Sequence, residues 1–153
     1  MPEKIEGGVT GGVDELYREV ILDHFKSPKN KGKVISPNAQ AEGVNPLCGD
    51  DYHLYLKVHG GNIQEIGFKG SGCAISKSSA SIMSTLIKGK SVEQAKNLRN
   101  AFLDMMTQDS FPQSRKEEVG KMMIFEGVKE FPVRVKCATL IWHALADALK
   151  DAD

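Results

Sequence analysis

The sequence predicts a single domain that combines α-helices with a small set of β-strands. Residues 51–69 alternate apolar and polar side chains, which is the pattern of paired strands with one buried face. Other segments place apolar residues at helical spacing, and they span residues 13–26, 75–88, 91–106 and 137–150. A chain of 153 residues is long enough to bury one core without disulfides or other cross-links.

The first half of the chain predicts a helix followed by three strands. The helix begins at Val13 and ends before Pro28, because the residue before a proline is pushed out of the helical conformation. Residues 39–44 predict a short strand, and the two strands of a hairpin follow. Gly60–Gly61 supplies the positive φ angles of a tight hairpin turn. Tyr55 falls on the solvent side of the alternation. The residues predicted on the buried side are Tyr52, Leu54, Leu56 and Val58, then Ile66 and Phe68. Ile63 falls on the opposite parity, so its register is not determined by the pattern.

The second half predicts helices. The first follows Cys73 and ends at Gly89, with serines opposite its apolar stripe. Ser91 opens the next helix through a capping box with Gln94, and residues 114–117 predict a second capping box before a short helix. Residues 122–128 are apolar without a clear period. The last helix is predicted to carry Cys137 in its first turn and to keep Trp142 off its buried face.

Composition and charge exclude several classes of protein. The 20 basic and 20 acidic residues cancel, which argues against nucleic-acid binding. No apolar run approaches the roughly 20 residues of a membrane span, so we expect no membrane partner. There is no apolar signal segment, and three cysteines are an odd count for a disulfide framework, so we expect a cytoplasmic location. Residues 1–12 are glycine-rich and predict a flexible tail before a single domain at 13–153.

Four residues form the candidate site. Cys48 and Asp50 flank Gly49 in a turn that Pro46 keeps out of helix and strand interiors. Cys73 and Cys137 are the other two cysteines, and each is predicted near a helix start. If folding gathers the three thiols, Asp50 is the natural fourth ligand, and a Cys₃Asp tetrahedron suits zinc or iron. Three unrelated buried thiols remain the alternative, because no Cys-x-x-Cys pair is present.

Several stretches carry a resemblance to a known family. They are residues 17–30 (YREVILDHFKSPKN), 45–50 (NPLCGD), 70–76 (GSGCAIS) and 134–137 (RVKC). These stretches resemble the U-type iron–sulfur cluster assembly proteins, the family of IscU, SufU and the NifU N-terminal domain. Lys136 stands where IscU-like members have a histidine, and residues 107–129 look like an insertion. Both features are similar to SufU-like members.

The resemblance implies a fold, a site and partners. The fold is α+β, a small three-stranded antiparallel sheet covered on one face by about five helices. Zinc is expected at Cys48, Asp50, Cys73 and Cys137, with iron or a [2Fe–2S] cluster as the alternative. Cys48 is expected to take sulfur as a persulfide from a PLP-dependent, SufS-like cysteine desulfurase, before a downstream iron–sulfur assembly complex. The candidate catalytic residues are Cys48, Asp50 and Arg134, whose guanidinium would offset the negative charge of the ligands.

Three functions therefore compete. The first is a zinc-dependent sulfurtransferase, and the second is a scaffold that assembles and transfers a [2Fe–2S] cluster. Lys136 weighs against the scaffold, because one candidate ligand is missing, although Asp50 remains. The third is a structural zinc domain, which needs no mobile ligand.

Overall fold

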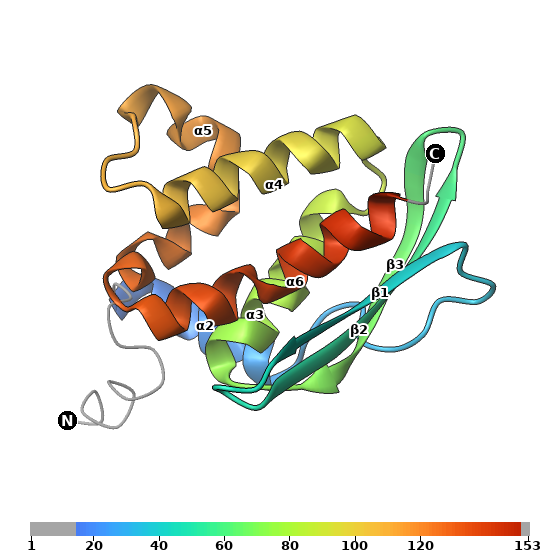
Figure 1. Cartoon of the computed structure of the whole chain (residues 1–153), viewed down its shortest axis with the longest axis horizontal. Helices are drawn as coiled ribbons and strands as arrows, with labels where there is room; N and C mark the ends of the chain where they lie inside the picture. The colour runs from blue at the N-terminus through green and yellow to red at the C-terminus, as the bar shows by residue number, and fades with distance from the viewer. Residues whose placement is uncertain (1–14, 151–153) are drawn as a thin grey trace.

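The computed structural model describes residues 15–150, which form a three-stranded antiparallel sheet packed against helices (Figure 1). The strands lie in the order β1–β2–β3, and they are β1 (Ala39–Asn45), β2 (Asp50–His59) and β3 (Asn62–Ser71). The α-helices are α2 (Glu15–Lys26), α3 (Ala74–Ile87), α4 (Val92–Thr107), α5 (Lys116–Val119) and α6 (Pro132–Lys150). Two 3₁₀ segments are η1 (Gln113–Arg115) and η2 (Gly120–Glu130). The predicted α+β fold is confirmed, whereas the predicted tail at 1–12 lies outside the described residues.

The helices form two layers on one face of the sheet (Figure 1). Helix α6 lies across β1 and β2, and α3 packs beside it against β3. Helix α2 packs on α3, while α4 and η2 pack on α6 and on each other, and α5 packs against α4 and η2. Within the described part of the chain, no helix has the length and apolar character needed to cross a bilayer.

The hairpin has the predicted buried face. Tyr52, Leu54, Leu56 and Val58 are all nearly inaccessible to solvent. A bulge resolves the register of Ile63, because Lys57 pairs with Glu65 whereas Val58 pairs with Ile63. The extra residue on β3 reverses the side-chain alternation, so that Ile63 is buried, as are Ile66 and Phe68.

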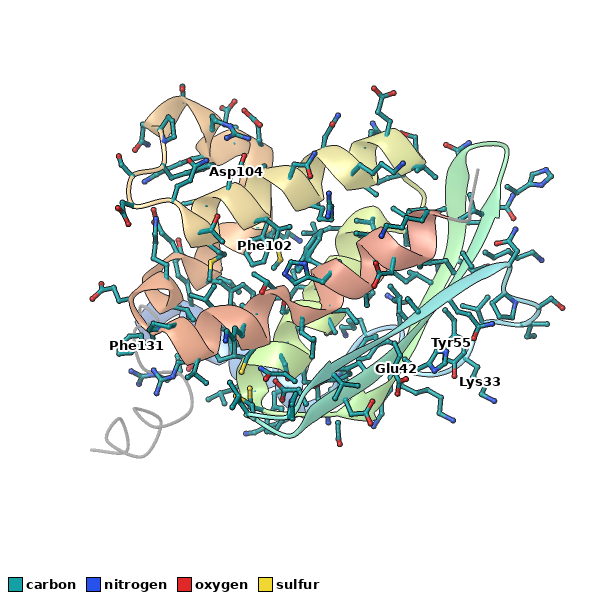
Figure 2. All side chains as sticks on the ribbon, in the orientation of Figure 1. Lys33, Glu42, Tyr55, Phe102, Asp104 and Phe131 are labelled. Carbon is teal, nitrogen blue, oxygen red and sulfur yellow. The ribbon has the colours of Figure 1, made fainter. Side chains whose placement is uncertain are left out.

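Tyr55 corrects the prediction of a solvent-facing side chain. It is buried, on the side of the sheet that faces away from α6 (Figure 2). Tyr55 pairs with Gly67, and a Cβ on Gly67 would collide with the backbone carbonyl of Gly32. The connector before β1 therefore crosses this face of the sheet and covers part of it.

The serine-bearing side of α3 is also buried, contrary to the polar side that the sequence predicts. Ser79 donates a hydrogen bond to the carbonyl oxygen of Ala138 over 2.6 Å and accepts one from the Trp142 indole over 3.2 Å. Trp142 is fully buried, so its predicted place off the buried face of α6 is wrong. Helix α3 packs against α2, α6, β3 and η2, and its hydroxyl groups are satisfied by backbone and side-chain partners. The buried serines are Ser76, Ser78, Ser79, Ser81 and Ser84.

Two predicted helix starts are wrong. Helix α6 begins at Pro132, whose fixed φ angle suits the first helical position, so Cys137 lies in the second turn and not in the first. The capping box predicted at Ser114 does not form, because Ser114 lies inside η1 and α5 has no side-chain cap. The box at Ser91 is confirmed, with both of its hydrogen bonds to Gln94 present.

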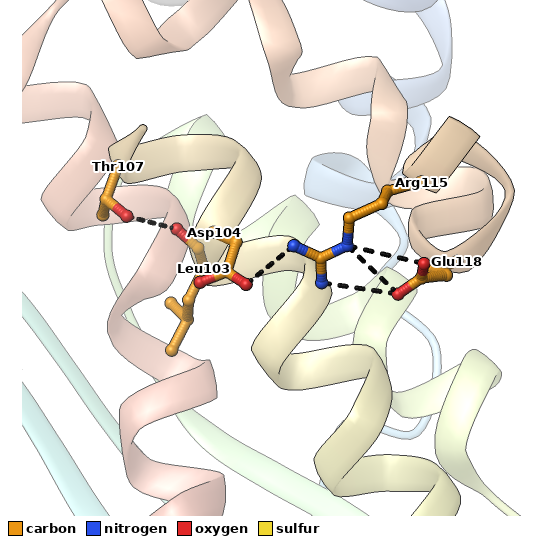
Figure 3. A network of polar contacts seen from close by, with 5 residues as sticks. All are labelled: Leu103, Asp104, Thr107, Arg115 and Glu118. Carbon is orange, nitrogen blue, oxygen red and sulfur yellow. Dashed lines mark hydrogen bonds and ion pairs between the residues drawn. The ribbon is translucent and has the colours of Figure 1, made fainter. Parts of the chain in front are cut away.

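Arg115 ties the segment between α4 and α6 to α4 (Figure 3). Its guanidinium donates a hydrogen bond to Asp104 over 3.0 Å and contacts Glu118 at 3.4 Å. The same group lies over the ring of Phe111, 5.2 Å from its centroid. One arginine thus joins the end of α4, the loop that carries Phe111, and α5.

Candidate metal centre

Cys48 lies in the loop that joins β1 to β2. Asn45 and Asp50 are the last paired residues of the two strands, and four residues connect them. The backbone of Asn45 accepts a hydrogen bond from the Cys48 amide over 3.2 Å, and Gly49 turns the chain with a φ of 71°. This geometry leaves Cys48 half-buried, in a loop whose Leu47 side chain is 71% exposed.

Asp50 is fully buried at the start of β2. Its Oδ1 accepts a hydrogen bond from the Cys73 amide over 3.0 Å. Its Oδ2 is also buried and has no hydrogen-bond partner among the residues that the structure describes. An unpaired buried carboxylate oxygen is costly, so this atom needs a further partner.

Cys73 is the N-cap residue of α3, as the sequence indicates. Its Sγ accepts a hydrogen bond from the Ser76 amide over 3.4 Å. The unpaired amides at a helix N-terminus stabilise negative charge, so this position favours a thiolate. Cys73 is half-buried and its backbone is tied to Asp50.

Cys137 approaches the same place from α6. It is buried, and its thiol donates a hydrogen bond to the Cys48 sulfur over 3.1 Å. The two sulfurs and a carboxylate oxygen of Asp50 all lie within 4.8 Å of one another. The Cys73 sulfur does not belong to this 4.8 Å group, although Cys73 contacts both Asp50 and Cys137. Folding therefore gathers three of the four predicted ligands and sets the fourth beside them.

The neighbouring thiols of Cys73 and Cys137 have pKa values that shift in opposite directions. Interaction with the neighbouring Cys137 thiol is the largest effect, and together with the Ser76 amide it lowers the pKa of Cys73 to about 6 against the opposing effect of burial. The Cys73 thiol, burial and the Cys48 thiol together raise the pKa of Cys137. In the absence of a cation, the negative charge is therefore held on Cys73 and the proton on Cys137.

This pair gives a testable pH dependence. In protein freed of metal by a chelator, we expect the alkylation of Cys73 by iodoacetamide to have a midpoint near pH 6. An unperturbed thiol has its midpoint at about 8.5. Cys137→Ala removes the donor and is expected to move the midpoint upward. Peptide mapping by mass spectrometry measures the rate at each pH, and an ordinary midpoint in the unaltered protein would contradict the assignment.

The donor set fits a borderline-soft cation. Thiolate sulfur and carboxylate oxygen are zinc ligands, and Cys48, Asp50 and Cys137 present one such atom each within a common radius. A cation there would give the unpaired Oδ2 of Asp50 the partner that the described residues do not provide. Cys73 offers the sulfur that would complete a four-coordinate shell.

The sequence does not predict a buried polar cluster that lies beside Asp50 and consists of Tyr52 and Ser76. The Tyr52 hydroxyl and the Ser76 hydroxyl are hydrogen-bonded over 2.8 Å, and burial raises the pKa of Tyr52. A Cβ on Gly72 would lie 2.6 Å from the Tyr52 hydroxyl and would collide with Asp50 Oδ1. Gly72 is therefore required for close packing of the carboxylate. The small residues before Cys73 are the only signal for this in the sequence, because Tyr52 and Ser76 match simpler strand and helix patterns.

Arg134 is predicted to offset the negative charge of the ligands, and in the structure it contacts an aromatic ring. Its guanidinium lies over the ring of Phe131, 4.7 Å from the centroid. Figure 2 labels Phe131 at the start of α6. Lys136, next to Cys137, is exposed. The role of Arg134 thus stays a prediction.

The chain is similar in sequence to known proteins along most of its length. The model of the NifU-like N terminal domain matches residues 16–138. The zinc-dependent sulfurtransferase SufU of Bacillus subtilis is 43% identical over 133 residues, which cover 87% of this chain and 88% of that protein. The iron–sulfur cluster assembly scaffold protein IscU of Streptococcus pyogenes serotype M1 is 38% identical, covering 90% of this chain and 85% of that protein.

A solved structure supports the same relationship. The crystal structure of FiSufU from the thermophile Fervidobacterium islandicum AW-1 has a TM-score of 0.78 and 36% sequence identity. The match covers 86% of this chain and 94% of that chain. Family match, sequence identity and fold agree, and the chain therefore belongs to the NifU-like N-terminal domain family, the U-type proteins of iron–sulfur cluster assembly.

Proposed function

We propose that this protein is a zinc-dependent sulfur acceptor that takes persulfide sulfur from a cysteine desulfurase on Cys48. The observation that carries this proposal is the group of Cys48, Asp50 and Cys137 ligand atoms within 4.8 Å, with an unpaired carboxylate oxygen among them. The 43% identical relative is named a zinc-dependent sulfurtransferase, which supports the same assignment. Zinc bound by these groups would keep the ligating thiols deprotonated at neutral pH.

Cys48 is the best placed of the three thiols to act as the nucleophile. It lies in a four-residue loop beside the exposed Leu47, whereas Cys73 caps α3 and Cys137 is buried within α6. A loop residue can leave a shared site at a lower cost than a residue fixed within a helix. Cys73 and Cys137 would meanwhile remain in place.

The proposed transfer is balanced without an external oxidant or reductant. The Cys48 thiolate attacks the outer sulfur of the partner's persulfide, and a new S–S bond forms on Cys48. The S–S bond within the partner's persulfide breaks, and the partner's cysteine leaves as a thiolate. The transferred sulfur is then carried on Cys48, as a persulfide, to the downstream iron–sulfur assembly machinery.

A [2Fe–2S] scaffold is the second candidate, because the 38% identical relative carries that description. The same four residues would then hold iron, with Asp50 as the replaceable ligand. Lys136 supplies no imidazole next to Cys137, which favours the sulfur acceptor.

Metal analysis and sulfur transfer distinguish the two candidates. We expect protein purified without added metal to contain one zinc and to stimulate a SufS-like desulfurase while accumulating one labelled sulfur on Cys48. Reconstitution with iron and sulfide, followed by intact transfer of a cluster to an apo-acceptor, is the result expected of a scaffold. Protein that binds zinc but neither accepts sulfur nor transfers a cluster would indicate a structural zinc domain.

A further inference from the structure

Asn45 faces Asp50 across the end of the β1–β2 ladder. The two residues are direct partners in the antiparallel register, so their side chains project to the same side of the sheet. Asn45 is only 7% exposed and Asp50 is fully buried. A buried amide and a buried carboxylate therefore share the end of the loop that carries Cys48.

Only one of the two polar atoms of the Asn45 side chain has a hydrogen-bond partner among the described residues. Its Oδ1 accepts a hydrogen bond from the Leu47 amide over 3.2 Å, which helps to fix the Cys48 loop. Its Nδ2 is buried and has no hydrogen-bond partner within the described residues. The Oδ2 of Asp50 is the unpaired buried acceptor on the opposite residue. An amide donor and an anionic acceptor are complementary, and a hydrogen bond to a charged group is among the stronger ones in proteins.

We propose that Asn45 is a positioning residue that offers the Asp50 carboxylate an alternative partner to the metal. When Asp50 Oδ2 leaves the cation, the Asn45 Nδ2–H donates a hydrogen bond to it. The carboxylate stays ionised throughout, so no proton is transferred. Asn45 thus lowers the cost of ligand exchange at a site that has to open for sulfur transfer.

This role predicts that removing the Asn45 side chain changes the rate of zinc release in the direction opposite to that expected for a purely structural residue. If Asn45 only holds the loop, Asn45→Ala should loosen the site and speed the loss of zinc. If Asn45 stabilises the departed carboxylate, the same change should slow zinc release by about tenfold, the expected size for one hydrogen bond to a charged group. Loss of the contact to Leu47 partly masks this effect, so the single variant is not sufficient.

A double-mutant cycle separates the two contributions. Zinc release to a chromophoric chelator is measured in the full chain, without a desulfurase, for Asn45→Ala, Asp50→Ala and the double variant. The loop contribution is present in both backgrounds, whereas the contribution through Asp50 is lost in Asp50→Ala. We expect Asn45→Ala to slow release about tenfold more in the native background than in the Asp50→Ala background. Equal effects in both backgrounds would overturn the proposal.

Asn45→Asp provides a second variant in case Asn45→Ala folds poorly. It keeps an oxygen for the Leu47 amide but replaces the donor by an acceptor that repels Asp50. We expect slower zinc release from this variant, and release at the unaltered rate or faster would contradict the proposal. The inference rests on the proposed function, because it takes Asp50 as a zinc ligand. Absent coupling in the cycle rejects the Asn45 role alone, whereas protein that lacks zinc and accepts no sulfur rejects the proposed function itself.

Discussion

Cys48→Ala is expected to reduce sulfur acceptance to background while leaving the fold in place. The residue is half-buried in a loop, so its loss removes the proposed nucleophile and little core packing. We expect the free energy of unfolding of the metal-free protein to change by no more than about 1 kcal/mol. Labelled sulfur bound after incubation with a desulfurase and cysteine measures the first effect, and denaturant titration measures the second.

The matched control for Cys48→Ala is Leu47→Ala, which alters the exposed neighbouring residue and keeps all three thiols. This control reports the contribution of the loop surface, and sulfur should still become attached to Cys48. Full sulfur acceptance by Cys48→Ala would remove Cys48 from the mechanism. Sulfur found on Cys73 or Cys137 would instead move the acceptor role to another of the gathered thiols.

Gly72→Ala is expected to weaken zinc binding strongly, although it adds a single methyl group. The backbone of Gly72 does not require glycine, because its φ angle is not in the left-handed region. The added Cβ would, however, collide with Asp50 Oδ1 and lie 2.5 Å from the Ser76 hydroxyl. These neighbours are buried, so the carboxylate has to move. Changes in groups that orient metal ligands typically cost about 10–100-fold in metal affinity, and we expect an effect of that size.

Competition with a chelator of known affinity measures this effect. Overpacking is also expected to cost about 1–3 kcal/mol of stability in the metal-free protein. Ser71→Ala, on the exposed neighbouring residue, is the control and should leave zinc affinity unchanged. Unchanged affinity in Gly72→Ala would show that the position of the Asp50 carboxylate does not govern metal binding.

The strands and the start of α4 followed from local chemistry, because each depends on residues close together in sequence. The alternation from Tyr52 to Val58 fixed the buried face of β2, and Ser91 with Gln94 fixed the start of α4. The prediction for Ile63 stayed open, because a bulge is a property of two paired strands and only the partner strand reveals it.

Predictions about burial failed where a second layer covers an element. Trp142 lies off the apolar line of α6, and Tyr55 lies on the outer side of the hairpin, yet both are buried. Helix α6 lies between the sheet and α4, and the connector before β1 crosses the outer side of the sheet. The periodicity of one segment indicates which face packs against the main core. It carries no information about a second element that covers the opposite face.

The sequence by itself determined which chemical groups are available to the site, three thiols and one carboxylate, and which elements carry them. Only the tertiary structure decided that Cys48, Asp50 and Cys137 meet within 4.8 Å while the Cys73 sulfur stays beside them. It also decided that Gly72, Tyr52 and Asn45 surround the carboxylate. The physical reason is that these contacts join the β1–β2 loop, the start of α3 and the second turn of α6. Their relative positions depend on packing across the whole core and not on any local pattern.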